Sequence, residues 1–181
     1  SGTQLSGSLP ETLAAATNLE ILTVGLGLSD TTMTGTLPES YAALTALRQF
    51  SLVGTKDING TLPASWGRTW TSLQVLDLFE NPSITGTIPS TWGHMSSLNV
   101  MRLADTGIQG SIPTELGLLT ELRDLQLFHT SLTGTMPSEI CKLRSMPWLT
   151  RLTADCGGGS SAEIECDCCS ECLQGSGSAQ P

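Results

Sequence analysis

The sequence predicts an α/β repeat solenoid, and two phrases that recur along the chain carry this prediction. The first phrase, Gly-Thr/Ser-Leu/Ile/Met-Pro, occurs six times, beginning at Gly7, Gly35, Gly60, Gly86, Gly110 and Gly134. The intervals between these glycines are 28, 25, 26, 24 and 24 residues, so the repeat unit has about 24 residues with short insertions. A unit of this length can bury its apolar side only against its neighbours, which stacks the repeats into one solenoid.

The second phrase is an apolar residue, two variable ones, an apolar one, a variable one and an apolar one. It reads Leu73-Leu76-Leu78 in a middle repeat, and the other copies are Leu19-Leu22-Val24, Leu47-Phe50-Leu52, Leu98-Met101-Leu103 and Leu122-Leu125-Leu127. This alternation predicts a strand with its apolar residues inward. Together with the period, it is typical of leucine-rich repeats, so we expect a right-handed superhelix with about six strands in a concave parallel sheet.

The glycine–proline phrase predicts a short second sheet beside the first. The glycine allows a tight bend, and the proline ends the strand before a helical turn. After the proline, apolar residues recur at three-residue steps, as in Tyr41-Leu44-Leu47, which predicts a 3₁₀ or irregular helix on the convex side. Trp66 and Trp92 occupy the slot of Tyr41 and are expected in the convex core. Polar residues at the strand ends are expected to satisfy turn backbone groups, namely Thr55, Asn81, Thr106 and Thr130.

These phrases divide the chain into three parts. We expect about six leucine-rich repeats over residues 1–154, a disulfide-rich cap over residues 155–174 that includes Cys141, and a flexible tail over residues 175–181. Short insertions should bulge from the edge between the two sheets, at residues 27–31, 56–57 and 82–83.

All six cysteines lie after the fifth complete strand phrase: Cys141, Cys156, Cys166, Cys168, Cys169 and Cys172. An even number at one end of a solenoid indicates three disulfides that close the terminal repeat, and an extracellular chain. The sequence leaves the pairing open, although vicinal Cys168 and Cys169 should have different partners, and a Cys141–Cys156 bond would staple the last repeat. A zinc site or a redox pair is the alternative, which the lack of nearby histidine and of a βαβ pattern disfavours.

The formal net charge is −9, and the cap is acidic without any Lys or Arg. An acidic surface repels phosphate backbones and anionic lipids, so nucleic acids and membrane surfaces are not expected partners. The sequence has no apolar run long enough to insert into a bilayer and no signal peptide. Because it starts in the middle of a repeat, we expect a processed protein or a piece of a longer one.

The recurring pattern Leu-Thr-Gly-Thr-Ile/Leu-Pro-x-x-Leu/Trp-x-x-Leu resembles the plant-type class of leucine-rich repeat. This class occurs in plant receptor ectodomains and polygalacturonase-inhibitor proteins, and similar repeats occur in diatom cell-surface proteins and trypanosomatid surface antigens. The ending Leu-Thr-Ala-Asp-Cys, followed by Cys166-Asp-Cys168-Cys169-Ser-Glu-Cys172, is most similar to the diatom-type cap. The resemblance covers nearly all of residues 3–173 but lacks the paired-cysteine N-terminal cap of the plant proteins. It implies an extracellular recognition or adhesion module, or alternatively an inhibitor of a cell-wall polysaccharide hydrolase.

The outward positions of the concave strands carry the candidate binding residues. Phe79 and Phe128 stand out, because a solvent-facing slot needs no aromatic residue for folding, and they lie two strands apart, roughly 10 Å. An exposed aromatic pair among charged residues is the composition of a protein-binding hot spot. The expected partner is a protein or a glycan, bound by Asp77, Phe79, Glu80, Arg102, Asp105, Asp124, Gln126, Phe128, His129 and Arg151.

The surface residues also allow alternative interpretations. Small polar residues flank each repeat glycine, and three of the six pairs are Thr-x-Thr, so an ice-binding second sheet is an alternative. Asn59 lies in an Asn-Gly-Thr glycosylation acceptor. No enzyme, cofactor or metal is expected, since His94 and His129 lie on different sides of the repeat, and Asp77 and Asp124 lie as solvated charges on an open sheet.

Overall fold

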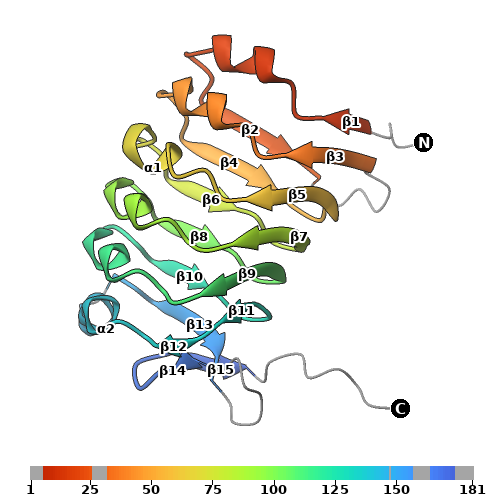
Figure 1. Ribbon diagram of the computed structural model, residues 1–181. Helices are drawn as coiled ribbons and strands as arrows, with labels where there is room; N and C mark the ends of the chain where they lie inside the picture. The colour runs from red at the N-terminus through yellow and green to blue at the C-terminus, as the bar shows by residue number, and fades with distance from the viewer. Residues whose placement is uncertain (1–5, 26–31, 147, 157–163, 174–181) are drawn as a thin grey trace, which may run out of the picture.

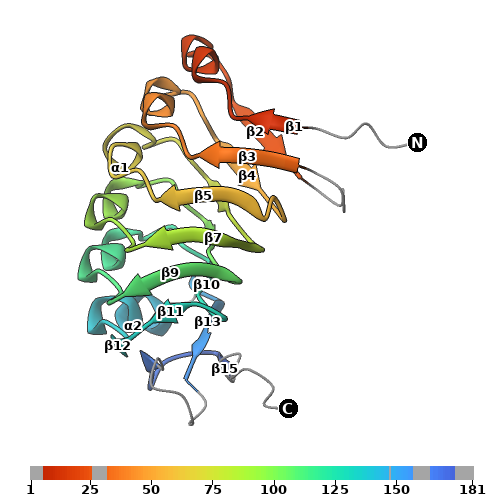
Figure 2. The same ribbon diagram turned by 45° about the vertical axis from the view of Figure 1, so that its right-hand side comes forward.

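The computed structural model describes residues 6–25, 32–146, 148–156 and 164–173. These residues form a stack of repeats that runs from β1 at one end to β15 at the other (Figures 1 and 2). Two parallel sheets run along the stack, and the short helices form a column along one side of it. The predicted α/β leucine-rich-repeat solenoid is therefore confirmed.

The larger sheet has seven parallel strands in the order β15-β13-β10-β8-β6-β4-β2. Equivalent positions of the strand phrase pair in register, as Leu76 does with Met101, so each inward residue stacks on its counterpart in the next repeat. Both of these side chains have no solvent exposure. The strands are β2 (Ile21–Val24), β4 (Gln49–Leu52), β6 (Val75–Asp77), β8 (Val100–Arg102), β10 (Asp124–Gln126), β13 (Arg151–Asp155) and β15 (Glu171–Leu173).

The second sheet has six strands in the order β1-β3-β5-β7-β9-β11. It has one strand fewer than the larger sheet, but its strands are not all shorter than those of that sheet: β7 has six residues, whereas β6 has three. Gly86 in β7 has φ +82°, and a Cβ there would lie 2.8 Å from the γ-methyl of Thr61, so glycine is required both by the bend and by the packing of the previous repeat. The strands are β1 (Ser6–Ser8), β3 (Thr32–Thr36), β5 (Asp57–Thr61), β7 (Asn81–Gly86), β9 (Thr106–Gly110) and β11 (Ser131–Leu132).

The helical side is mostly 3₁₀, as predicted, with two short α-helices. Trp66 and Trp92 have no solvent exposure, and their indole N–H groups donate to the carbonyls of Pro38 and Pro63, at 3.1 and 3.0 Å. Each carbonyl belongs to the preceding repeat, so these residues join neighbouring repeats by packing and by a buried hydrogen bond. The helices are η1 (Glu11–Ala15), η2 (Glu39–Ala43), α1 (Trp66–Thr69), η3 (Ser90–His94), η4 (Thr114–Leu118) and α2 (Ser138–Ser145).

Polar side chains at the strand ends satisfy the turns, as the sequence predicts. Asn81 is fully buried; its amide donates to the carbonyls of Leu52, Leu78 and Phe79, and its oxygen accepts from the backbone N–H and hydroxyl of Thr55. The hydroxyls of two threonines each donate to a carbonyl three residues earlier, in the pairs Thr106–Leu103 and Thr130–Leu127. Asn81 and Thr55 thus link two repeats, whereas the hydroxyls of Thr106 and Thr130 close their own turns.

One of the expected insertions is a bulge. The register between β7 and β9 shifts between Asn81 and Thr85, which places Pro82 and Ser83 in the extra loop. Gly107 on the neighbouring strand faces this loop, and a Cβ there would lie 2.6 Å from the Pro82 carbonyl oxygen. The insertion at residues 27–31 lies outside the described residues. None of the helices in the described part of the chain is long and apolar enough to cross a membrane.

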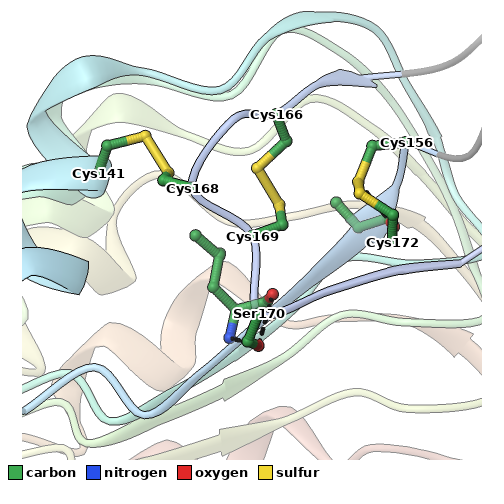
Figure 3. The surroundings of a disulfide bond; sticks show 9 residues. Cys141, Cys156, Cys166, Cys168, Cys169, Ser170 and Cys172 are labelled. Carbon is green, nitrogen blue, oxygen red and sulfur yellow. Dashed lines mark hydrogen bonds between the residues drawn. A yellow bond between two sulfur atoms is a disulfide. The ribbon is translucent and has the colours of Figure 1, made fainter.

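The cap continues the larger sheet beyond the last full repeat, because β15 adds the seventh strand beside β13. β14 (Ile164–Glu165) pairs with β12 (Gly134–Thr135) in a separate two-stranded sheet. The cysteines form three disulfides, which lie next to one another across the cap: Cys141–Cys168, Cys166–Cys169 and Cys156–Cys172 (Figure 3). Vicinal Cys168 and Cys169 have different partners, and α2 is stapled by Cys168 rather than by Cys156.

Candidate binding surface

The outer face of the seven-stranded sheet, the side away from the core, carries an ion-pair network across three strands. Arg102 in β8 donates to Asp77 of β6 at 3.2 Å and to Asp124 of β10 at 3.2 and 3.3 Å. The Gln126 amide donates to both oxygens of Asp124, at 3.0 and 2.9 Å. The strand register brings these side chains together, because Asp77, Arg102 and Gln126 are register partners on adjacent strands and Asp124 lies two residues before Gln126. The sequence placed each residue on this face but did not predict that they bind one another.

The two carboxylates are not the solvated charges that we expected from the sequence. The side chains of Asp77 and Asp124 are only 11% and 15% exposed, while that of Arg102 is 38% exposed. Burial lowers the pKa of Arg102, but the hydrogen bonds and negative charges of Asp124 and Asp77 outweigh it, so its pKa is raised above the ordinary value. Arg102 therefore stays charged between them, and part of its side chain remains open to solvent.

A row of apolar residues lies beside this network at the strand ends. Phe79 and Phe128 are half-buried rather than fully exposed, and Ala104 between them is fully buried. The Phe128 ring packs edge-on against His129, with centroids 5.1 Å apart. The contact with His129 holds the Phe128 ring, and the partial burial of both rings leaves a smaller apolar area for a partner.

The next residue of each strand end forms a third row, made by Glu80, Asp105 and His129. All three have left-handed backbone conformations, with φ of 60°, 54° and 52°. Gly54 holds the same place one repeat earlier with φ 68°. A side chain in this conformation costs roughly 1 kcal/mol relative to glycine. The polar side chains of Glu80, Asp105 and His129 are therefore present at these turns at a cost in stability. His129 Nδ1 lies 2.9 Å from Asp105 Oδ1.

A groove of about 460 Å³ runs along this third row, between the ends of the two sheets. The bulge of β7 forms one wall through Pro82, and Lys56 lies at one end. The sequence analysis marked the polar residues but missed Lys56, which it treated only as an insertion. The groove is lined by Lys56, Glu80, Pro82, Asp105, Thr106, Gly107 and His129.

Arg151 does not reach the ion-pair network. It lies in β13, and it lines a smaller cavity of about 160 Å³ at the cap end of the same face, together with Gln126 and Phe128. Thr153 of β13 also lines it. The other two lining residues, Glu171 and Leu173, were not predicted, because the seventh strand was not expected.

The second sheet presents the small polar residues that flank the repeat glycines. The register staggers neighbouring strands by two residues, so Ser8 pairs with Thr34, Thr36 with Asn59 and Thr61 with Thr85. Asn59 is exposed, as a glycosylation acceptor must be. All the flanking residues are exposed: Ser6, Ser8, Thr34, Thr36, Asn59, Thr61, Thr85, Thr87, Gln109, Ser111, Thr133 and Thr135.

The arrangement of the described residues does not favour catalysis or metal binding. Arg102 fills the space between Asp77 and Asp124, where a glycosidase would need a water or a sugar. The sulfurs of Cys156, Cys166 and Cys169 lie within 4.8 Å of one another, but all are in disulfides and are not thiolate ligands.

Comparison with known proteins supports the repeat and the fold. The Leucine Rich Repeat family model matches residues 72–95. No curated protein matches the chain. Among solved structures, the leucine-rich-repeat ectodomain of the Arabidopsis thaliana receptor kinase GASSHO1/SCHENGEN3, in complex with CASPARIAN STRIP INTEGRITY FACTOR 2, is 30% identical, with a TM-score of 0.72 over 83% of this chain and 17% of that one.

Two further structures share the fold. A TDR receptor is 29% identical, with a TM-score of 0.73 over 84% of this chain and 26% of that one. A plant ice-binding protein is 23% identical, with a TM-score of 0.68 over 89% of this chain and 46% of that one, which shows a common fold alone. The chain spans only about a quarter or less of the two receptors' length. It is a leucine-rich-repeat solenoid that is similar to part of a plant receptor ectodomain.

Proposed function

We propose that this chain is an extracellular recognition module that binds a protein partner through the outer face of its seven-stranded sheet. The observation that carries the proposal is the Arg102 network with the neighbouring Phe79–Phe128 row. Together they form a continuous surface over β6, β8 and β10, in which charged and apolar groups are already fixed in place.

Such a surface suits protein recognition for two physical reasons. The ring of Phe128 packs against His129, so its binding removes little side-chain entropy, and covering Phe79 as well gains apolar burial at two points. The exposed edge of Arg102 offers donors in a fixed orientation, because two carboxylates hold the guanidinium. Charges held in this way set the register of a partner more than they add affinity.

The comparisons support the same class of function. The GASSHO1/SCHENGEN3 ectodomain has the same repeat fold and is a receptor domain in complex with a named partner. By analogy we assign an extracellular location and a protein ligand to this chain, ahead of a glycan ligand. An inhibitor of a cell-wall hydrolase would be one such protein-binding module, with the enzyme as its partner.

The test is capture of partners by the immobilised protein from extracellular material of its source, with paired variants. Phe79→Ala with Phe128→Ala should abolish capture, and Arg102→Met should weaken it. Thr85→Ala and Thr133→Ala on the second sheet are the matched control, and this double variant should capture as well as wild type. If the second-sheet variant loses the partner and the phenylalanine variant keeps it, the proposed face is wrong.

Ice binding is the second candidate, because the twelve exposed flanking residues recur in each repeat, in or next to the strands of the second sheet and in β12. The γ-methyls of Thr36, Thr61 and Thr87 lie 3.2, 2.8 and 3.1 Å from where a Cβ would stand on the glycine of the next repeat, so each methyl lies over a glycine. Asn59 and Gln109 interrupt the array, and a glycan on Asn59 would cover it. An ice-recrystallisation assay on unglycosylated protein decides: activity that Thr87→Tyr abolishes would make the second sheet the functional face.

A further inference from the structure

Two disulfides of the cap lie close enough for their sulfurs to react with one another (Figure 3). The Sγ atoms of Cys156, Cys166 and Cys169 all lie within 4.8 Å of one another, although Cys156 is bonded to Cys172 and not to the other two. Among the described residues, no other cysteine sulfur belongs to this group. A thiolate attacks a disulfide at one of its two sulfurs, so Cys156 is the sulfur that a thiol of the neighbouring pair would meet.

The position of Cys156 also decides which sulfur would leave. Thiol–disulfide exchange forms a bond to the attacked sulfur and expels the other sulfur of that disulfide as a thiolate. Attack at Cys156 by Cys166 or Cys169 therefore expels Cys172, whose sulfur lies outside the close group. Cys172 is exposed, so its thiol would be open to solvent and to reagents.

The Cys166–Cys169 disulfide is the one that opens at the least cost to the fold. It spans 3 residues, whereas the other two disulfides span 16 and 27. A short loop restricts the unfolded chain least, so its disulfide stabilises the fold least, and by linkage the fold stabilises that disulfide least. Both of its cysteines are partly exposed, so a small thiol can reach them from solvent.

We propose that Cys166–Cys169 is an exchange site for an external dithiol and that it passes the reduction on to Cys156–Cys172. In the first step, the dithiol gives two electrons and two protons. The Cys166–Cys169 bond breaks, two thiols form, and the reagent leaves as a disulfide. In the second step, the thiolate of Cys166 or Cys169 bonds to the Cys156 sulfur, and Cys172 leaves as a thiolate that takes up the proton lost by the attacking thiol. The second step needs no further reductant.

The exchange loosens one strand of the cap. Cys172 lies in β15, and its bond to Cys156 ties this edge strand to the residue that follows β13. The disulfide between the cap and α2 takes no part and keeps the cap attached. Glu171 and Leu173 of β15 line the cavity of about 160 Å³ on the outer face. The thiol content of the surroundings therefore controls how firmly this wall of the cavity is held, which is a property beyond the binding of a partner.

The experiment follows the folded, oxidised protein in dithiothreitol, with acid quenching, alkylation of free thiols and mass spectrometry of the peptides. Alkylated Cys166 or Cys169 should appear first. A crosslink from Cys156 to Cys166 or Cys169 should follow, together with alkylated Cys172. Cys141–Cys168, whose sulfurs lie outside the close group, is the internal control and should stay intact.

The double variant Cys166→Ser with Cys169→Ser removes the attacking thiols and leaves only direct reduction of Cys156–Cys172. Groups joined by a short chain have an effective concentration of about 1 mM or more, so at about 0.1 mM dithiol the internal step should be at least about tenfold faster than the external one. The opened wild type should therefore form the Cys172 thiol at least about tenfold faster than the double variant. Absence of the Cys156 crosslink in the wild type, equal rates in the two proteins, or earlier opening of Cys141–Cys168 would overturn the inference.

Discussion

Arg102 gives the sharpest test of how the outer face is held together. Its side chain makes charge-assisted bonds to Asp77 and Asp124, whose own side chains are 11% and 15% exposed. Arg102→Met keeps most of the stem but removes the charge and its donors. Two largely buried carboxylates then lie near each other without a cation, which is more damaging than the loss of a surface ion pair.

The expected loss of stability follows from burial. Removing one partner of a fully buried ion pair costs about 3–5 kcal/mol, whereas exposed pairs contribute about 0–1 kcal/mol. The Arg102 side chain is 38% exposed, so solvent screens part of the interaction, and we expect a cost of about 2 kcal/mol at neutral pH. Urea unfolding followed by circular dichroism measures this difference.

Two controls identify the cause of this loss. Asp77→Asn combined with Arg102→Met removes one of the two stranded charges and should recover about half of the loss, because the remaining repulsion is gone. Acid should also narrow the gap between Arg102→Met and wild type, since protonated carboxyls no longer need the cation. If Arg102→Met costs less than about 0.5 kcal/mol, or if the double variant is no more stable than the single one, the network does not stabilise the face as argued.

Three further predictions concern the scaffold. Burial, and secondly the charge of Glu11, raise the pKa of Tyr41 to about 12, so the phenolate absorbance of this sole tyrosine should appear near pH 12 in the native protein. Because the folded-state pKa lies above the unfolded value of 10, the free energy of unfolding should fall as the pH rises from about 10 to 12. A native protein whose tyrosine titrates near pH 10 would refute this. Gly107→Ala should lower stability by about 1–3 kcal/mol because its Cβ would lie 2.6 Å from the Pro82 carbonyl, which differential scanning calorimetry against Gly54→Ala can check. Paired Cys→Ser changes should cost about 3.5, 3 and 2 kcal/mol for the disulfides that span 27, 16 and 3 residues, and a different order in chemical unfolding would contradict the loop-entropy account.

The fold was predictable because each repeat obeys the same local physics. Leu76 and Met101 stack in register, and Trp66 and Trp92 bond to the prolines of the preceding repeats, as their positions in the two phrases imply. In such a solenoid, the environment of a residue is set by its place in the repeat and by its two neighbours. The second sheet, the 3₁₀ helices and the polar strand ends follow from the same rule.

The contacts on the outer face were less predictable, since they depend on distances between side chains. The sequence placed Asp77, Arg102 and Asp124 on one face, but it could not tell solvated charges from a buried network. Opposite charges on paired positions of adjacent strands, as in Asp77 and Arg102, or on diagonal positions, as in Arg102 and Asp124, are a usable signal for such a network. The half-burial of Phe79 and Phe128 has no comparable signal, because it depends on how the turn directs each ring.

The cap shows where the regularity of the repeats ends. Within the array, a strand meets the same partner chemistry on both sides, so its buried polar groups are satisfied in the same way in each repeat. β13 meets β15 instead, a strand from the cap that carries none of the repeat phrase. Among the described residues, the two buried side-chain groups without partners, Thr153 Oγ1 and Asp155 Oδ1, both lie on β13. An irregular neighbour leaves polar groups unmatched and cavities unfilled, and these are the conditions that a specific ligand can exploit.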